Sequence, residues 1–147
     1  MELAIAYQQM GRTVESINTY EVLLKTNPRN EAAANNLAMM LVDRADKVSL
    51  DRAKALSEPF AKANNLRFVD TYGWVLIARG EYAKAISVLQ PIVDKVPNAA
   101  VVRYHLAMAQ VKTGDVAGGR ANLEAALKSG DGFEGAAAAK TLLASLK

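Results

Sequence analysis

Side chains that could carry chemistry are few in this chain of 147 residues, which contains one histidine and no cysteine. His105 could act as a general base only if stacking brought a carboxylate such as Asp70 or Asp43 beside it. The lack of cysteine excludes a thiolate nucleophile and a thiolate metal site, and a single histidine excludes a metal site built from several histidines. We therefore expect no catalytic residues, no metal site and no cofactor.

Sequence motifs of enzymes are also missing. The sequence contains no Gly-x-Ser-x-Gly turn, no glycine-rich phosphate loop and no acidic calcium loop. Gly118 and Gly119 lie within a helical pattern, and we interpret them as a site of close helix packing. The sequence thus favours a binding or structural protein over an enzyme.

The composition predicts closely packed α-helices as the elements that position these side chains. Apolar residues make up 51% of the chain but aromatic residues only 6%, and alanine, the best helix former, is abundant. β-branched and aromatic residues form no alternating runs, and the chain has only nine glycines and four prolines. These features argue against a β-sandwich, a barrel or a disordered chain.

Charge and hydropathy exclude two classes of partner. Eighteen basic and fifteen acidic residues give a net charge of +3 without any basic block, so we expect no nucleic-acid partner. No apolar stretch approaches the roughly 18 residues that a membrane span requires, so we expect no direct membrane insertion. No signal peptide is visible at Met1–Leu3, but the first repeat looks truncated, so bacterial cytoplasm and periplasm both stay open.

A unit of about 34 residues repeats along the whole chain. One apolar position recurs at spacings of 34, 35 and 34 residues, as Leu3, Leu37, Tyr72 and Leu106. A turn position follows the same spacing, as Gly11, Ala45, Gly80 and Gly114. A small residue of the second helix recurs at 37, 32 and 34 residues, as Ser16, Ala53, Ala85 and Gly119. The spacing departs from the repeat length in the second unit and then returns to it. We therefore expect stacked units, each of which must present the same face to the next unit.

These residues resemble the tetratricopeptide repeat (TPR) family, whose unit is a helix–turn–helix of about 34 residues. The third unit matches best, through Tyr72–Gly73, Gly80–Glu81–Tyr82, Ala85 and Pro97. The second unit departs most, with Ala45 in place of glycine and Asn65 in place of proline. Short phrases of the sequence are similar to repeats of bacterial exopolysaccharide-export and protein-sorting systems.

The resemblance implies an all-α fold, a right-handed α-α superhelix closed by a C-terminal capping helix. The domain would be a single array over residues 1–147. We expect a truncated repeat 1 at 1–30, then repeats at 31–65, 66–99 and 100–133, and a capping helix at 134–147. We expect the chain to be a fragment of a longer array, because the first repeat begins within its first helix.

Local signals predict the helix ends. The expected helices cover 1–10, 13–26, 31–45, 50–64, 66–79, 82–95, 99–113, 116–129 and 133–146. We expect Asn30 and Ser49 to cap the helices that follow them, and Asp131 with Glu134 to form a capping box for the last helix. Pro59 and Pro91 are placed alike in their units, which predicts a matched bend in two second helices.

The expected binding site is a row of mostly apolar positions on the first helix of each repeat, distinct from the positions that pack on the second helix. In the TPR architecture these positions line the concave face, where an apolar floor with a polar rim is typical of a binding surface. The expected groove residues are Ile5, Asn35, Met39, Val42, Asp70, Trp74, Ile77, Tyr104, His105, Met108, Val111 and Lys112. The alternative is that a tight superhelix buries part of this row between neighbouring repeats.

We therefore expect a protein-interaction module that binds a partner helix or an extended peptide in its concave groove. The alternative function is self-assembly, in which the open N-terminal end of the array stacks on another copy to form a homo-oligomer. A related helical repeat of about 35 residues binds RNA, but this row is too apolar for that chemistry. The sequence identifies neither the partner nor the pathway.

Overall fold

The computed structural model describes residues 1–146, and these form an all-α superhelix without strands. The elements are α1 (Glu2–Gln9), α2 (Thr13–Thr26), α3 (Glu31–Asp43), α4 (Lys47–Ser57), the 3-10 helix η1 (Glu58–Lys62), α5 (Leu66–Ala78), α6 (Tyr82–Lys95), α7 (Ala100–Lys112), α8 (Val116–Lys128) and α9 (Ala136–Ser145). The predicted fold class is confirmed. Among these helices, none has the length and apolar character that crossing a membrane would require.

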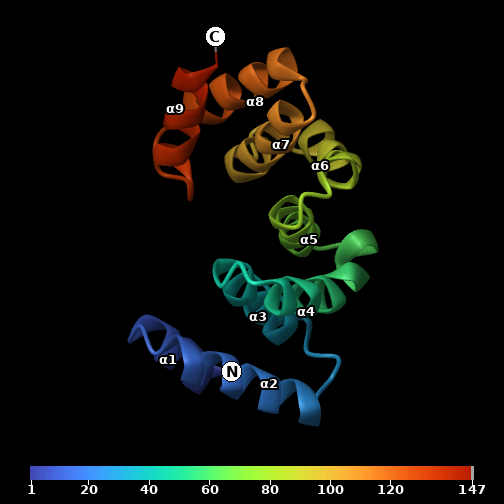
Figure 1. Cartoon of the computed structure of the whole chain (residues 1–147), viewed down its shortest axis with the longest axis vertical. Helices are drawn as coiled ribbons and strands as arrows, with labels where there is room; N and C mark the ends of the chain where they lie inside the picture. Colours follow the sequence, from blue (N-terminus) through green and yellow to red (C-terminus); the bar gives the residue numbers. More distant parts are fainter. Residues whose placement is uncertain (147) are drawn as a thin grey trace.

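Four helix pairs are stacked along the long axis of the molecule (Figure 1). The pairs are α1–α2, α3–α4, α5–α6 and α7–α8, and we number the repeats 1 to 4 in this order. The first helices of successive repeats also contact one another, α3 with α5 and α5 with α7. The stack is curved, because α1 and α9 project to the same side while α6 lies on the other side (Figure 1).

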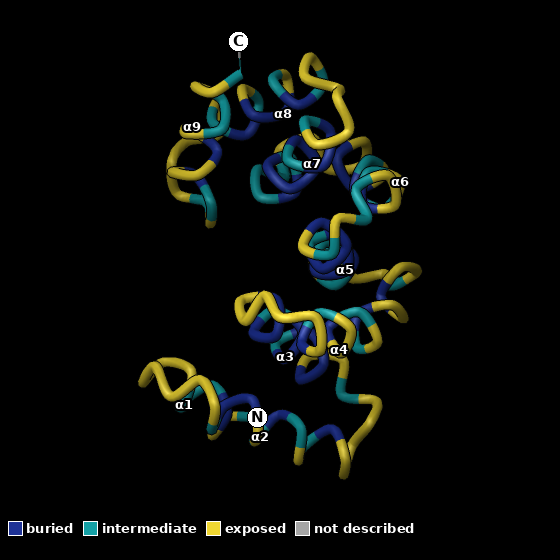
Figure 2. The backbone as a smooth tube through the Cα atoms, viewed as in Figure 1, coloured by how far each residue is buried: buried dark blue, intermediate teal, exposed yellow. Residues whose placement is uncertain are grey.

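The core follows the repeated apolar positions. Leu37, Tyr72 and Leu106 are buried at equivalent sites of repeats 2, 3 and 4. Small residues allow the two helices of a repeat to approach, because a Cβ atom on Gly73 would lie 2.6 Å from Cγ of Leu89. Figure 2 shows the buried residues concentrated in α3, α5 and α7, whereas Ala4 is the one buried residue of α1.

The turns within the repeats adopt a left-handed backbone conformation. Gly11, Gly80 and Gly114 have φ angles of 72°, 76° and 91°. Ala45 occupies the equivalent turn of repeat 2 with a φ of 54°, which an alanine adopts only at a cost that glycine avoids. The turn geometry is therefore imposed by the architecture even where the residue disfavours it.

The two helix caps predicted in repeat 2 have different outcomes. The predicted cap at Asn30, before the first helix α3, is confirmed, since its side chain accepts a hydrogen bond from the Ala33 amide. The predicted cap at Ser49 is wrong, because α4 begins at Lys47 and Asp46 is the capping residue. The Asp46 carboxylate accepts hydrogen bonds from the Ser49 amide at 2.9 Å and from its hydroxyl at 2.6 Å. Ser49 therefore donates both of its hydrogen bonds to Asp46, and Asp46 caps the helix in its place.

The expected pair of matched bends is wrong as well. Helix α4 ends at Ser57, and Pro59 lies in the first turn of η1, which follows α4 directly, so this proline stands where the α-helix changes to a 3-10 helix. Pro91 instead lies inside α6, which continues to Lys95. The two prolines thus lie in different local structures, a 3-10 helix and an α-helix, although they occupy equivalent positions in their repeats.

The last helix begins later than expected and without the predicted capping box. Helix α9 starts at Ala136 and follows Gly135, whose φ of 91° permits the sharp entry. A Cβ atom on Gly135 would lie 2.6 Å from the Tyr104 ring, so the chain crosses that ring only as glycine. Asp131 accepts a hydrogen bond from Lys140 instead of capping the helix. Leucines of α9 pack on the core of repeat 4.

Candidate functional site

A polar row of buried side chains connects the first helices of repeats 2, 3 and 4. We define it as Asn35, Asp70, Thr71 and His105. The Thr71 hydroxyl donates to the side-chain amide oxygen (Oδ1) of Asn35 at 2.7 Å, and Nδ1 of His105 lies 2.8 Å from an Asp70 carboxylate oxygen. The two contacts are equivalent, since each joins one site of a repeat to the neighbouring site of the next repeat. A carboxylate only accepts, so Nδ1 of His105 carries the proton.

The polar row is almost fully removed from water. Asn35, Thr71 and His105 are 3%, 5% and 7% exposed. The amide of Asn35 donates to Asn36, and Asn36 donates in turn to the Tyr20 hydroxyl at 3.0 Å. Every buried side-chain nitrogen and oxygen among the described residues has a hydrogen-bond partner. The polar row therefore forms contacts between repeats, and within it only Asp70 is partly open to water.

Tyr104 extends the polar row toward the C-terminus. Its ring centroid lies 5.6 Å from that of His105, and its other side packs under Gly135. Burial raises the pKa of the Tyr104 phenol above its usual range, because the charged phenolate would lose its hydration. Tyr104 thus belongs to the contact between repeat 4 and α9.

An open row of apolar side chains lies one helical turn further along the same helices. We define it as Ile5, Met39, Trp74 and Met108, one residue from each repeat. All four are half-buried, and Ile5, Trp74 and Met108 pack against the core. The open row is the part of the expected groove that remains accessible at equivalent sites in all four repeats.

The remaining predicted groove residues divide between core and surface. Val42 and Ile77 are only 8% and 6% exposed and belong to the core. Val111 packs on α8, since its side chain lies 2.5 Å from where a Cβ atom on Gly119 would be. Lys112 is exposed at the end of α7. The accessible apolar floor is therefore narrower than the sequence suggested, because Val42, Ile77 and Val111 pack inside the array and leave the open row as its accessible part.

Trp74 connects the two rows. Its ring is stacked on that of His105, with the centroids 4.4 Å apart and the planes inclined by 26°. The stack covers one face of the imidazole, while Asp70 occupies Nδ1. A histidine held in this way is fixed in position, and no serine or cysteine lies beside it in the polar row as a nucleophile. The arrangement supports packing and recognition.

Sequence reasoning placed Thr71 and Asn36 at the polar edge of the groove but missed the contact of Thr71 with Asn35 and that of Asn36 with Tyr20. A signal for the first exists, because Thr71 follows Asn35 by 36 residues and His105 follows Asp70 by 35. Pairs of polar residues separated by one repeat length mark contacts between stacked helices. Among residues 1–146 no group of three histidine, aspartate or glutamate side chains is arranged to hold a metal ion.

Two family models described as tetratricopeptide repeat match the sequence, one over residues 76–146 and the other over residues 1–30. A thermophilic TPR protein of Thermus thermophilus matches with a TM-score of 0.79 and 19% identity, over 99% of this chain and 78% of that one. The crystal structure of MamA matches with a TM-score of 0.74 and 18% identity, over 90% and 77% of the two chains. A MamA structure from AMB-1 matches with a TM-score of 0.68 and 23% identity, over 92% and 74%.

These structural likenesses establish the fold alone, and a comparison with curated proteins found no match. The narrower likeness to export and sorting systems therefore stays a prediction. The two family models together match residues 1–30 and 76–146, which is most of the chain. The solved structure of a TPR protein has a similar fold over 99% of this chain. The chain belongs to the tetratricopeptide repeat family.

Proposed function

We propose that the open row binds a helix or an extended segment of a partner protein. TPR arrays are protein-interaction scaffolds, and this chain has their fold. The observation that supports the proposal is that the open row stays only half-buried at the same site of every repeat, although each of its residues is large and apolar. Apolar side chains aligned on successive helices fit a ligand that runs along the array.

The chemistry of the open row suits a protein ligand. Methionine side chains adapt to ligands of different shape, and tryptophan is enriched among residues that dominate binding energy. Met39 and Met108 flank Trp74 at the positions one repeat before and one repeat after it. Because the polar row is occupied by contacts within the chain, specificity would come from exposed charges beside the open row, such as Asp43 and Lys112.

The experiment is a binding measurement with peptides selected on the folded protein from a random library. We expect Trp74→Ala to weaken binding by at least about 2 kcal/mol, which is about thirtyfold. Val48→Ala is the matched control, because Val48 is 79% exposed and lies in α4, away from the open row. Equal affinities of the Trp74→Ala variant and the unaltered protein, measured by calorimetry, would contradict the proposal.

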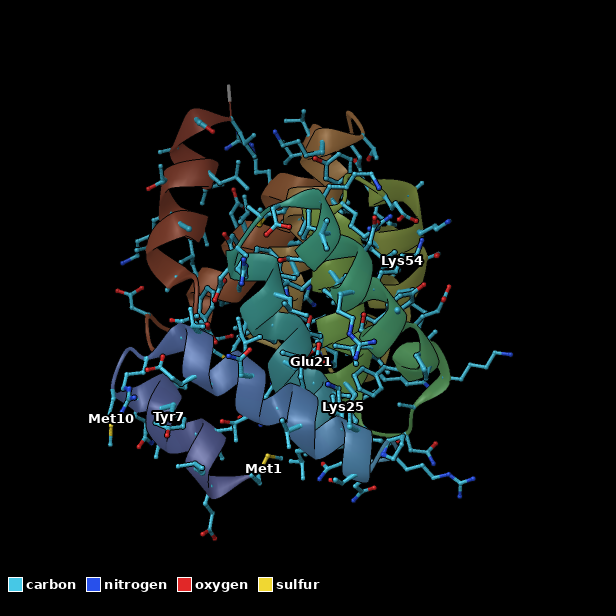
Figure 3. The ribbon with its side chains drawn as sticks, turned by 60° about the horizontal axis from the view of Figure 1, so that its bottom comes forward. Met1, Tyr7, Met10, Glu21, Lys25 and Lys54 are labelled. Atoms are coloured by element: carbon cyan, nitrogen blue, oxygen red, sulfur yellow. The ribbon has the colours of Figure 1, made fainter. Side chains whose placement is uncertain are left out.

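Self-assembly through repeat 1 is a second candidate, favoured by one observation. Leu3 is 57% exposed, whereas the equivalent residues of the other repeats, such as Leu37, are buried. Met10 is 68% exposed, and Figure 3 shows it extending away from the end of the molecule beyond Tyr7. An apolar end face of this kind could pack on a second copy.

Sedimentation velocity separates the two functions. If repeat 1 mediates self-assembly, the protein will sediment as an oligomer at high concentration and Leu3→Glu will make it a monomer. A monomer at all concentrations that still binds the selected peptides would remove self-assembly and leave the peptide proposal in place.

A further inference from the structure

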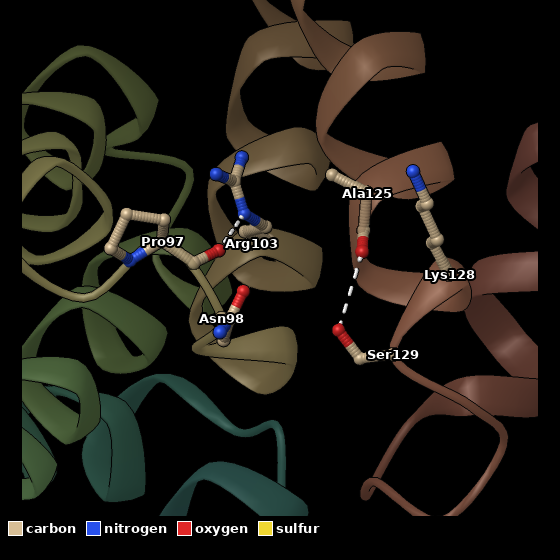
Figure 4. A pocket seen from close by; sticks show the side chains of 6 residues that line it. All are labelled: Pro97, Asn98, Arg103, Ala125, Lys128 and Ser129. Carbon is tan, nitrogen blue, oxygen red and sulfur yellow. Dashed lines mark hydrogen bonds between the residues drawn. The ribbon is translucent and has the colours of Figure 1, made fainter.

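Two hollows lie at equivalent places in the array, where one repeat is joined to the next. The repeat-3 notch has a volume of about 340 Å³ and lies between the segment 61–64, α5 and α6. The repeat-4 notch has a volume of about 560 Å³ and is lined by Pro97, Asn98, Arg103, Ala125, Lys128 and Ser129 (Figure 4). Five of these six residues lie 34 positions after a residue of the repeat-3 notch. The hollows are therefore a product of the repeat itself.

The repeat-3 notch combines an apolar wall with two cations. Leu66, Val88 and Ile92 line the wall, and the amino groups of Lys62 and Lys95 are carried by residues of the rim. Both lysines are exposed, and within the described chain neither forms an ion pair. An apolar side chain with acidic neighbours would satisfy both parts of this surface.

A free backbone acceptor also borders the repeat-3 notch. Pro91 has no amide hydrogen, so the carbonyl of Ser87, one turn earlier in α6, receives no helical hydrogen bond from it. Ser87 and Pro91 both line the notch. An extended peptide could donate a backbone N–H to this carbonyl, as a strand does at an exposed edge.

The repeat-4 notch has the same sign of charge. The Arg103 guanidinium donates to the Pro97 carbonyl and to the Asn122 side chain, both at 2.6 Å, so its charge meets no carboxylate. Lys128 is exposed on the opposite wall (Figure 4). Over the part of the chain that the structure describes, neither cation has an acidic partner.

Several cations near the turns within the repeats are paired instead, although Lys112 forms no ion pair in the described chain. Glu81 accepts from Lys54 at 2.9 Å, from Arg79 at 2.8 Å and from Lys84 at 2.9 Å. Lys47 pairs with Asp51 at 2.7 Å. The modest net charge of the chain is thus unevenly distributed, with unpaired positive charge at the joints between repeats.

We infer that the two notches form a second docking surface, which binds an acidic, extended segment of a partner protein carrying apolar side chains. The apolar wall accommodates a side chain, the cations attract flanking carboxylates, and the Ser87 carbonyl accepts a backbone amide. A nucleic acid fits less well, because no aromatic residue lines either notch to stack on a base. This surface is separate from the open row and does not depend on it.

The test uses a labelled peptide of four Glu-Glu-Leu units and a second peptide in which serine replaces leucine. Fluorescence anisotropy at low salt gives the affinities for the folded protein. We expect the double variant Lys62→Gln/Lys95→Gln to bind the leucine peptide about fivefold to tenfold more weakly, because two exposed attractions are lost. The control Lys47→Gln/Lys84→Gln removes the same charge from exposed residues near the turns, and Trp74→Ala alters the open row.

The expected pattern is unchanged binding in both controls and weaker binding of the serine peptide. Equal loss in the two double variants would overturn the inference, because net charge alone would then explain the binding. Equal affinity for the leucine and serine peptides would overturn the role of the apolar wall. Loss of binding in Trp74→Ala would place the peptide on the open row. Tighter binding of a thymidine oligonucleotide, lost in Lys62→Gln/Lys95→Gln, would assign the surface to nucleic acid.

Discussion

The polar row and the open row lie on the same helices, one turn apart. Met39 follows Asn35 by four residues, and Trp74 follows Asp70 by four. Asn35 is 3% exposed and bonded to the next repeat, whereas Met39 is half-buried, and Asp70 and Trp74 are both half-buried. On this face three polar residues, Asn35, Thr71 and His105, are therefore more deeply buried than the apolar residues of the open row, which reverses the usual distribution.

The difference shows that burial in a repeat array is decided by the neighbouring repeat. A side chain that faces the next first helix is covered whatever its polarity, and a polar one then needs a partner on that helix. A side chain one turn away is covered less completely, even where it contacts the next repeat as Trp74 contacts His105. The comparison therefore predicts that changes in the polar row reduce stability, and that changes in the open row mainly reduce binding.

The largest effect is expected from Asp70→Ala. The change leaves Nδ1–H of the buried His105 without an acceptor, which costs about 1–3 kcal/mol of the free energy of unfolding. Urea denaturation measures it. Asp43→Ala is the control, because Asp43 is exposed and forms no ion pair in the described chain, so its change stays within about 0.5 kcal/mol. Equal stability of the two variants would remove the structural role of the polar row.

Trp74→Ala should cost less folding free energy than the removal of a core tryptophan. A fully buried tryptophan costs about 3–5 kcal/mol on truncation, and we expect less than about 2 kcal/mol because Trp74 is only half-buried. The same variant should lose its peptide affinity. A loss of about 3–5 kcal/mol in urea denaturation would place Trp74 in the core and erase the difference between the rows.

Thr71→Val tests the other contact of the polar row with almost no change of shape. The variant removes the hydroxyl that donates to Asn35, and we expect a loss of about 1 kcal/mol in the free energy of unfolding. In the control Thr113→Val, the exposed hydroxyl bonds only to carbonyls of its own helix, so the loss should be smaller. Thermal denaturation that ranks the two variants in the opposite order would argue against the contact.

The smallest effect is expected outside both rows, at Glu81. Hydrogen bonds from Arg79, and then from Lys54 and Lys84, lower the pKa of Glu81 from 4.5 to about 2. A lowered pKa stabilises the folded state above the ordinary value, and the contribution is lost as the pH falls from 4.5 through about 2. We expect Glu81→Gln to cost less than about 1 kcal/mol at neutral pH, because these ion pairs reach solvent.

The measurement for Glu81 is stability against pH. The unaltered protein should lose more stability between pH 4.5 and pH 2 than Glu81→Gln does. Glu2→Gln is the control, since Glu2 is exposed and forms no ion pair among the described residues. Parallel curves for the unaltered protein and Glu81→Gln would mean that the ion pairs of Glu81 do not contribute in solution.

The sequence was sufficient for the repeat, the helix pairs and the turns, because these depend on spacing and on residues such as Gly80 that act locally. It was not sufficient at Ser49, where Asp46 competes as the cap, or at Pro59, where a 3-10 turn absorbs the proline. It was also not sufficient to separate Val42 from Met39 on the groove floor. That separation depends on how far each repeat is rotated against the next, which no residue encodes alone.

The stack of Trp74 on His105 has an optical consequence. The chain contains one tryptophan, so its emission comes from a single ring in α5, and that ring touches a histidine of α7 at a centroid distance of 4.4 Å. An aromatic ring in contact with an excited indole changes its surroundings and therefore its emission lifetime. The lifetime of Trp74 thus reports the contact between two successive repeats, and it changes when a ligand or a change of curvature separates the two rings.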